Sequence, residues 1–356
     1  MPKAKYPPIF DGHNDTILEI LRGRDFFKKS DKGHIDLPRA QKGGLGGGFF
    51  AVFVPSPRPM AGWPGLNSNP DGSYHIPLPD PLEHRYARDF ATKALRKLFA
   101  LETDSKGAVK IVRTADELAQ CLDDGTFAMI LHFEGVDAID TNLDSLHVFY
   151  QAGLRSVGIT WSRPNAFGYG VPFAFPLGPD TGPGLTDAGK ALVKECNQLG
   201  IMIDLSHLNE KGFWDVAELS NAPLVATHSN AHALAATPRN LTDKQLDAVK
   251  ESGGIVGINY HIGFYAKDGR SDQETSYAEI VRHAAYIADR IGIDHVGLGS
   301  DFDGATMPQD LKDAAGLPKL MDALKEHGFD KKALKKIAHG NWARVEEDVA
   351  LTALFR

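Results

Sequence analysis

The chain of 356 residues contains only two cysteines, Cys121 and Cys196. Two cysteines cannot build the disulfide framework of a small secreted domain, so we expect both thiols to be buried and inert in a reducing compartment. The chain also lacks a signal-peptide pattern at its N-terminus and any apolar stretch of membrane-spanning length. These absences favour a cytoplasmic protein that has no membrane partner.

Positive charge is scarce as well. Lys and Arg number 39 against 46 Asp and Glu, which gives a formal net charge of −7. This mild acidity, without any basic run, offers nothing to attract a polyanion, so we expect no nucleic-acid partner. The remaining composition, with 42% hydrophobic and 24% charged residues, is typical of a folded globular protein with a large core.

Short apolar runs rich in β-branched and aromatic residues alternate with helix-like stretches, which is typical of repeated βα units around a parallel sheet. The eight predicted strands are residues 9–12, 48–54, 127–132, 156–160, 201–205, 224–227, 254–259 and 295–300. Amphipathic helices are predicted at 81–101, 115–122, 187–199, 243–252 and 277–291. Eight strands with covering helices predict an α/β fold, a (β/α)8 TIM barrel, as one domain over residues 1–356.

Two long connections rich in Pro, Gly and Asn follow predicted strands, at residues 55–80 and 163–186. At the carboxyl ends of barrel strands, loops of this length are lids or subunit contacts, so a homodimer is one expectation; a disordered surface loop is the alternative. The tail, residues 331–351, is predicted to be a terminal helix that packs on the barrel exterior.

Polar residues gather where the predicted strands end, the face on which barrel enzymes build their sites. His13 and Asp15 are two residues apart on an extended segment, so both side chains can reach one ion. Glu134, His207 and His228 stand at three further strand ends, and they offer the nitrogen and oxygen ligands that zinc takes. A lone His-x-Asp pair is usually incidental, but this convergence predicts a metal site in which Glu134 can bridge two ions.

Other histidines are predicted to have plainer roles. His132 is expected to be a packing residue, and His232 and His261 are expected to be loop residues or pocket lining. Solvated rings are expected for seven further histidines, which are His34, His75, His84, His147, His283, His327 and His339.

Six motifs in the same order resemble the membrane (renal) dipeptidase family over nearly the whole chain. They are Phe10-Asp11-Gly12-His13-Asn14-Asp15-Thr16, His132-Phe133-Glu134-Gly135, Asp204-Leu205-Ser206-His207, Thr227-His228-Ser229, Pro238-Arg239-Asn240 and Gly299-Ser300-Asp301-Phe302-Asp303-Gly304. The resemblance implies a barrel of the metal-dependent amidohydrolase type with two Zn²⁺ ions per chain. One ion would be held by His13, Asp15 and Glu134, and the other by Glu134, His207 and His228.

The resemblance also implies the reaction. The family hydrolyses dipeptides and tolerates a D-residue at the C-terminal position; water activated by the two ions would attack the scissile carbonyl. Asp301 would pass the proton from that water to the leaving amine, and Arg239 would bind the free carboxylate of the dipeptide.

One position departs from the family pattern. Many members have a histidine that contacts the substrate carbonyl where this chain has Trp161. Trp161 polarises the carbonyl more weakly, or Arg163 or Asn165 substitutes for the histidine, or the substrate differs; a core-packing Trp161 is the remaining alternative.

The leading hypothesis is therefore a zinc-dependent dipeptidase. A related binuclear zinc amidohydrolase acting on N-acyl amino acids or lactones is the alternative enzyme. An inert metal-stabilised scaffold is disfavoured, because all the ligand positions and Asp301 are present.

Overall fold

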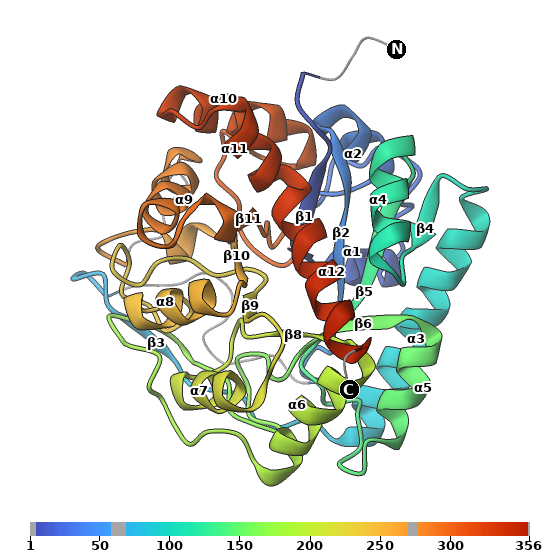
Figure 1. Ribbon diagram of the computed structural model, residues 1–356, viewed down its shortest axis with the longest axis vertical. Coiled ribbons are helices and arrows are strands. Elements are labelled where there is room, and N and C mark those ends of the chain that lie inside the picture. Colours follow the sequence, from blue (N-terminus) through green and yellow to red (C-terminus); the bar gives the residue numbers. More distant parts are fainter. Residues whose placement is uncertain (1–4, 58–68, 270–275, 355–356) are drawn as a thin grey trace.

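A parallel barrel forms the centre of the computed structural model, which describes residues 5–57, 69–269 and 276–354 (Figure 1). Its strands are β1 (Ile9–Asn14), β2 (Leu45–Phe53), β5 (Phe127–Glu134), β6 (Leu154–Gly158), β8 (Met202–Asp204), β9 (Val225–Ala226), β10 (Ile255–Ile258) and β11 (Val296–Leu298). Pairing runs β2-β1-β11-β10-β9-β8-β6-β5, and β2 also pairs with β5, which closes the ring. The eight predicted strands and the (β/α)8 fold are confirmed.

Helices surround the ring of strands (Figure 1). They are α1 (Thr16–Leu21), α2 (Leu37–Gly43), α3 (His84–Asp104), α4 (Ala115–Asp124), α5 (Asp144–Ala152), α6 (Asp187–Leu199), α7 (Glu210–Leu219), α8 (Asp243–Glu251), α9 (Ala278–Ile291), α10 (Leu317–His327), α11 (Lys331–Lys335) and α12 (Asn341–Leu354). Local sequence fixes several ends: α8 begins at a capping box of Thr242 and Gln245, and α6 stops at Gly200 in the left-handed conformation.

Strand β5 illustrates how the barrel separates its two apolar layers. Met129, Leu131 and Phe133 point outward into the core beneath the helices, whereas Ala128 and Ile130 point into the barrel. Because side chains alternate along a strand, Glu134 lies on the inward face at the carboxyl end. The same alternation that fills the barrel therefore delivers a carboxylate to its mouth.

The C-terminal segment differs from the prediction. Instead of one helix on the barrel exterior, α11 and α12 are separated by the π-helical turn Lys336–Gly340. Trp342 of α12 is fully buried in the same apolar cluster as the barrel interior, and its Nε1 donates to Leu298 O at 3.1 Å. A Cβ atom on Gly12 or Gly297 would approach the Trp342 ring to 2.5 or 2.6 Å. The tail therefore closes the amino end of the barrel, using space left by glycines.

The long connections contain structure that the sequence did not predict. Strand β3 (Tyr74–Ile76) from the first pairs antiparallel with β7 (Phe173–Phe175) from the second. Residues 58–68 of the first connection lie outside the described residues. A further short strand, β4 (Val109–Ile111), extends the sheet beyond β5.

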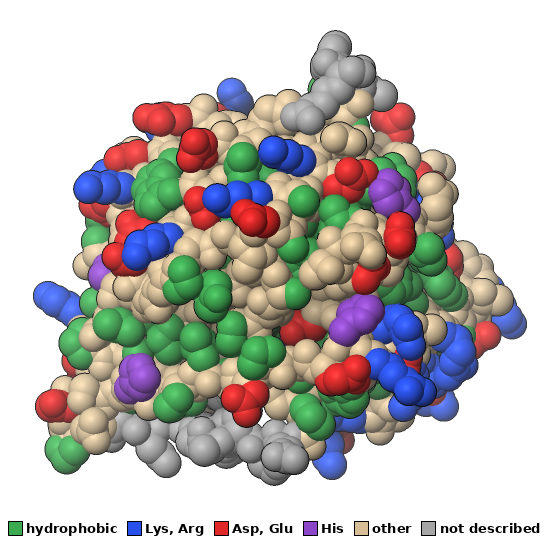
Figure 2. All heavy atoms as spheres, turned by 90° about the horizontal axis from the view of Figure 1, so that it is seen from below, with side chains coloured by type: hydrophobic (Ala, Val, Ile, Leu, Met, Phe, Trp, Pro, Cys, Tyr) green, Lys and Arg blue, Asp and Glu red, His purple; other side chains and the backbone are tan. Residues whose placement is uncertain are grey.

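The surface mixes charges of both signs. On the face in Figure 2, Lys and Arg side chains stand among Asp and Glu side chains. Among the described residues, no helix is long and apolar enough to span a membrane. Cys121 and Cys196 are both free and buried, as predicted, and burial raises the pKa of each thiol.

Candidate metal centre

The five predicted ligands come together at the carboxyl end of the barrel. His13 is on β1, Asp15 follows that strand, and Glu134 ends β5. His207 follows β8 and His228 follows β9. All five side chains are buried.

Glu134 is the centre of this cluster. Its Oε1 lies 3.1 Å from His207 Nε2 and 3.6 Å from His228 Nε2. Its Oε2 lies 3.8 Å from His13 Nε2, which in turn is 3.5 Å from Asp15 Oδ2. The atoms therefore fall into two groups of possible metal ligands, His13-Asp15-Glu134 and Glu134-His207-His228, which share the two oxygens of one carboxylate.

The residues present fit divalent cations. Three buried atoms have no hydrogen-bond partner within the described chain: both ring nitrogens of His13, and Asp15 Oδ1. Buried polar atoms are almost always satisfied, so these atoms are arranged for a partner other than protein. Imidazole nitrogens and carboxylate oxygens are the ligands that zinc takes.

The electrostatics also favour bound cations. Burial lowers the pKa of His13, but Glu134 and Asp15 outweigh that effect and raise it to about 10. Burial raises the pKa of Glu134 well above its usual value, in opposition to His13, which lowers it. Converging carboxylates in a buried site thus need positive charge, which a divalent cation supplies without a proton.

An uncommon backbone conformation positions the side chains of His207 and Asp301 at the carboxyl end of the barrel. His207 and Asp301 have φ angles of 66° and 60°, in the left-handed region that non-glycine residues rarely adopt. The Asp301 amide donates to His13 O at 2.9 Å, which ties the end of β11 to β1. Gly304 leaves room here, because a Cβ atom would lie 2.0 Å from Asp15 Oδ2 and 2.7 Å from Asp301 Oδ1.

Asp301 and Arg239 border the ligand cluster. Asn259 Nδ2 donates to Asp301 Oδ2 at 2.9 Å. Arg239 is buried, its Nη2 donates to His228 O at 3.0 Å, and its Nε has no hydrogen-bond partner in the described chain. Burial lowers the pKa of Arg239 to about 10, although Asp301 and Glu134 act to raise it, so the guanidinium stays charged at neutral pH.

Trp161 lies beside the cluster, with its ring centroid 5.9 Å from that of His207. It is 8% exposed and packs in an aromatic group with Phe173 and Phe53. The two side chains predicted to substitute for the family histidine donate hydrogen bonds to backbone carbonyl groups instead. Asn165 Nδ2 donates to Ile159 O at 2.7 Å, and Arg163 Nη2 donates to Val54 O at 3.1 Å.

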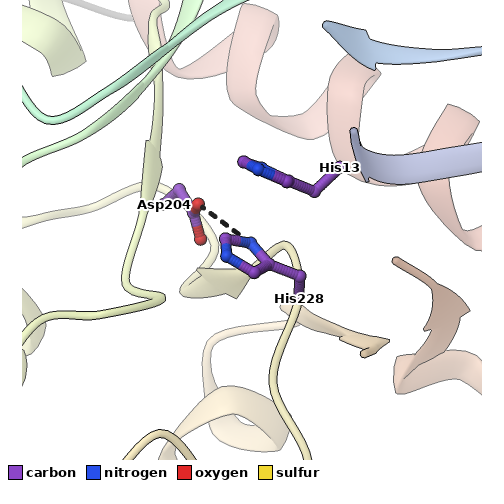
Figure 3. Close-up of side chains that lie close together, drawn as sticks. All are labelled: His13, Asp204 and His228. Atoms are coloured by element: carbon purple, nitrogen blue, oxygen red, sulfur yellow. Dashed lines mark ion pairs between the residues drawn. The ribbon is translucent and has the colours of Figure 1, made fainter. Parts of the chain in front are cut away.

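Several supporting residues were not singled out from the sequence. Ser162 Oγ lies 2.8 Å from His207 Nδ1, and Thr227 Oγ1 lies 2.8 Å from His228 Nδ1. Asp204, buried next to Thr227, is the third member of an additional group with His13 and His228 (Figure 3). The sequence signals for it were its place at the end of β8 and its membership of the motif that ends at His207.

The other histidines fall into different environments. His132 is buried in the barrel, with Nδ1 2.8 Å from Ser156 Oγ. His232 and His261 each contact a backbone carbonyl, of Leu177 and Thr306. The prediction of a solvated His283 was wrong: the ring lies on the buried face of α9, and its Nδ1 accepts from Ala231 N at 3.1 Å.

Comparisons with known proteins find similar chains and similar folds. A metallopeptidase from Rhodobacter sphaeroides, solved with a phosphinate mimic of the dipeptide L-Ala-D-Ala, is 48% identical with a TM-score of 0.94, covering 97% of this chain and 100% of that chain. A Klebsiella pneumoniae protein described as an uncharacterized protein in the pqqA 5' region is 48% identical over 261 residues, 73% of this chain and 96% of the relative. An amidohydrolase from Pseudomonas aeruginosa, 21% identical and matched over 96% of each chain, shares the fold with a TM-score of 0.74.

The family comparison covers almost the full length. The model of the membrane dipeptidase family, peptidase family M19, matches residues 4–354. The chain therefore belongs to the membrane dipeptidase family, and it is a metallo-dipeptidase.

Proposed function

We propose that this chain hydrolyses the peptide bond of free dipeptides, including those with a D-residue at the C-terminal position, with two zinc ions. The observation that carries the proposal is the sharing of Glu134 between two ligand groups at the barrel mouth. The 48% identical metallopeptidase was solved with a mimic of L-Ala-D-Ala, which supports this substrate class.

His13, Asp15 and Glu134 would hold one zinc ion, and Glu134, His207 and His228 the other. When bound, the two ions would polarise the scissile carbonyl and lower the pKa of a water molecule. The surrounding burial lowers the local dielectric, which strengthens each of these interactions.

Asp301 would take the proton from the attacking water and deliver it to the leaving amine. Its carboxylate lies at the mouth beside Asp15, close enough that both would contact a Cβ atom on Gly304. Asn259 engages only one of its oxygens, Oδ2, through a hydrogen bond of 2.9 Å. Asp301 is thus oriented while keeping a basic oxygen for proton transfer.

Arg239 would bind the substrate carboxylate and limit substrate length. One of its terminal nitrogens is used by His228 O, while its buried Nε has no partner in the described chain. Phe264 lies 5.3 Å from the guanidinium carbon, in cation–π geometry, and holds the fork in place. A carboxylate bound there would supply the donors with their missing acceptor.

Hydrolysis of three matched substrates tests the proposal. With zinc-loaded protein, L-Ala-D-Ala should be cleaved, whereas its C-terminal amide should be a poor substrate because Arg239 then lacks an anionic partner. N-acetyl-D-alanine distinguishes the alternative class, N-acyl amino acids. Preference for N-acetyl-D-alanine, or no hydrolysis of any dipeptide, would overturn the proposal.

A further inference from the structure

Asp204 is a buried carboxylate next to the ligand cluster that the proposed reaction does not use. It is 1% exposed, and its Oδ2 lies 3.9 Å from His228 Nδ1 (Figure 3). With His13 and His228 it forms a group whose ligand atoms are close enough to hold an ion. Asp204 could thus be a direct ligand or a support for His228, and its hydrogen bonds distinguish the two.

Both oxygens of Asp204 already have donors. The backbone amides of Ser206 and Thr227 donate to Oδ1, at 3.0 and 2.8 Å. The Thr227 hydroxyl donates to Oδ2 at 2.6 Å. Protein donors thus occupy three of the roughly four acceptor sites of an ionised carboxylate, so the arrangement favours support.

The Thr227 hydroxyl links Asp204 to His228, since its oxygen is also 2.8 Å from His228 Nδ1. A hydroxyl has one proton, and an ionised carboxylate only accepts, so that proton points to Asp204. The hydroxyl oxygen must then accept a proton from His228 Nδ1. In a neutral imidazole this leaves Nε2 without a proton, facing Glu134 Oε1 at 3.6 Å.

We infer that Asp204 is a positioning residue that acts through the Thr227 hydroxyl to hold His228 in the tautomer whose Nε2 can bind a cation. The inference rests on the proposed function for the cation. The direction of donation, from His228 to Thr227 to Asp204, follows from these contacts together with an ionised Asp204.

His207 provides an internal comparison. Its Nδ1 also faces a hydroxyl, Ser162 Oγ at 2.8 Å. In the described part of the chain, however, no carboxylate hydrogen-bonds to Ser162, so nothing comparable directs that proton. Of these two histidines, His228 alone faces a hydroxyl whose proton is directed by a carboxylate.

The variant Asp204→Asn would reverse this polarity without changing the shape of the side chain. Two backbone amides donate to Oδ1, so that position must remain an oxygen, and the new NH₂ group must replace Oδ2. It would donate to Thr227 Oγ1, whose own proton would then turn to His228 Nδ1. The His228 proton would move to Nε2 and block the ligand atom.

The inference is tested by equilibrium competition for zinc between the protein and a chromophoric chelator. Thr227→Val deletes the hydroxyl and should weaken the binding of one of the two zinc ions about 10-fold, and Asp204→Asn should weaken the binding of that ion about 100-fold, in the range known for residues behind metal ligands. Thr227→Ser keeps the hydroxyl and should bind zinc as the unchanged protein does.

Thr160→Val is the matched control, because the buried Thr160 hydroxyl has no hydrogen-bond partner in the described chain. It should leave zinc binding unchanged. Thermal unfolding of each metal-free variant identifies any that does not fold; if Asp204→Asn fails, the comparison of Thr227→Val with Thr227→Ser decides.

Equal zinc affinity in Thr227→Val and the unchanged protein, or equal loss in Thr227→Ser and Thr227→Val, would overturn the inference. Fewer than two zinc ions on the unchanged protein would instead overturn the proposed function.

Discussion

The two ends of the barrel are built on the same strands and have opposite chemistry. On the inward face of β5, Ile130 belongs to the apolar cluster that Trp342 closes, and Glu134, four residues later, stands among the proposed metal ligands. At the amino end, Trp342 packs in a cluster of apolar side chains that includes Phe10, Phe49 and Val345. At the carboxyl end, His13 and Asp15 have buried polar atoms that find no hydrogen-bond partner among the described residues.

This contrast separates stability from function. Apolar burial at the amino end favours folding, with roughly 25 cal/mol gained for each Å² of apolar surface removed from water. Unpartnered buried polar atoms oppose folding, so the carboxyl end is maintained for what it binds. Substitutions at one end should therefore change the free energy of unfolding, and substitutions at the other should change metal binding and catalysis.

Glu134→Ala should have the largest effect, because it removes a ligand from both groups at once. We expect hydrolysis to fall to background and zinc content to drop more than in His13→Ala, His207→Ala or His228→Ala. Elemental analysis and dipeptide assays measure both, with the exposed Glu347→Ala as control. Equal zinc retention across the four ligand variants would contradict a bridging role.

Asp301→Asn should separate catalysis from metal binding at the same end. The amide keeps the shape of the side chain but cannot accept a proton, so kcat should fall by roughly 100-fold or more while zinc content persists. Steady-state kinetics together with zinc analysis measure this. Near-normal turnover would mean that another group is the base.

Arg239→Ala should have a smaller effect that depends on the substrate. A buried charge-assisted contact is worth roughly 1.5–3 kcal/mol, so kcat/KM for free dipeptides should fall about 10- to 150-fold. For amidated dipeptides the change should be small, because the contact is absent already. Equal losses on both substrates would make Arg239 structural.

Trp342→Ala should have the smallest effect on turnover and a large one on folding. Removing a buried tryptophan costs roughly 3–5 kcal/mol of unfolding free energy, which denaturant titration detects. The same change at the partly exposed Trp214, which is 37% exposed, is the control and should cost far less. Loss of zinc from folded Trp342→Ala protein would show that the two ends are coupled.

The strands and the meeting of the five candidate ligands were predictable because their signals are local. A buried parallel strand is a short apolar run, and its polar continuation marks the carboxyl end, as at Glu134. The destination of Trp342 was not predictable, because it depends on space left by Gly12 and Gly297 in distant strands. The β3 and β7 pair is equally non-local, since it joins two connections about a hundred residues apart.

The residues that support the proposed ligands also could not be predicted from local sequence patterns. Asp204 belongs to one of the six family-like motifs, but the motif does not indicate what the side chain does. Its role follows from a hydroxyl supplied by the next barrel strand, at Thr227, and that neighbour is known only once the register of β8 and β9 is set. Likewise, the burial of His283 depends on which face of α9 meets the barrel.

The number of zinc ions bound by the purified protein tests the central claim most directly. After saturation with zinc and removal of excess metal, elemental analysis should find close to two ions per chain, and chelation should abolish hydrolysis of L-Ala-D-Ala until zinc is restored. Full activity with one ion or none would contradict a centre in which Glu134 bridges two metals.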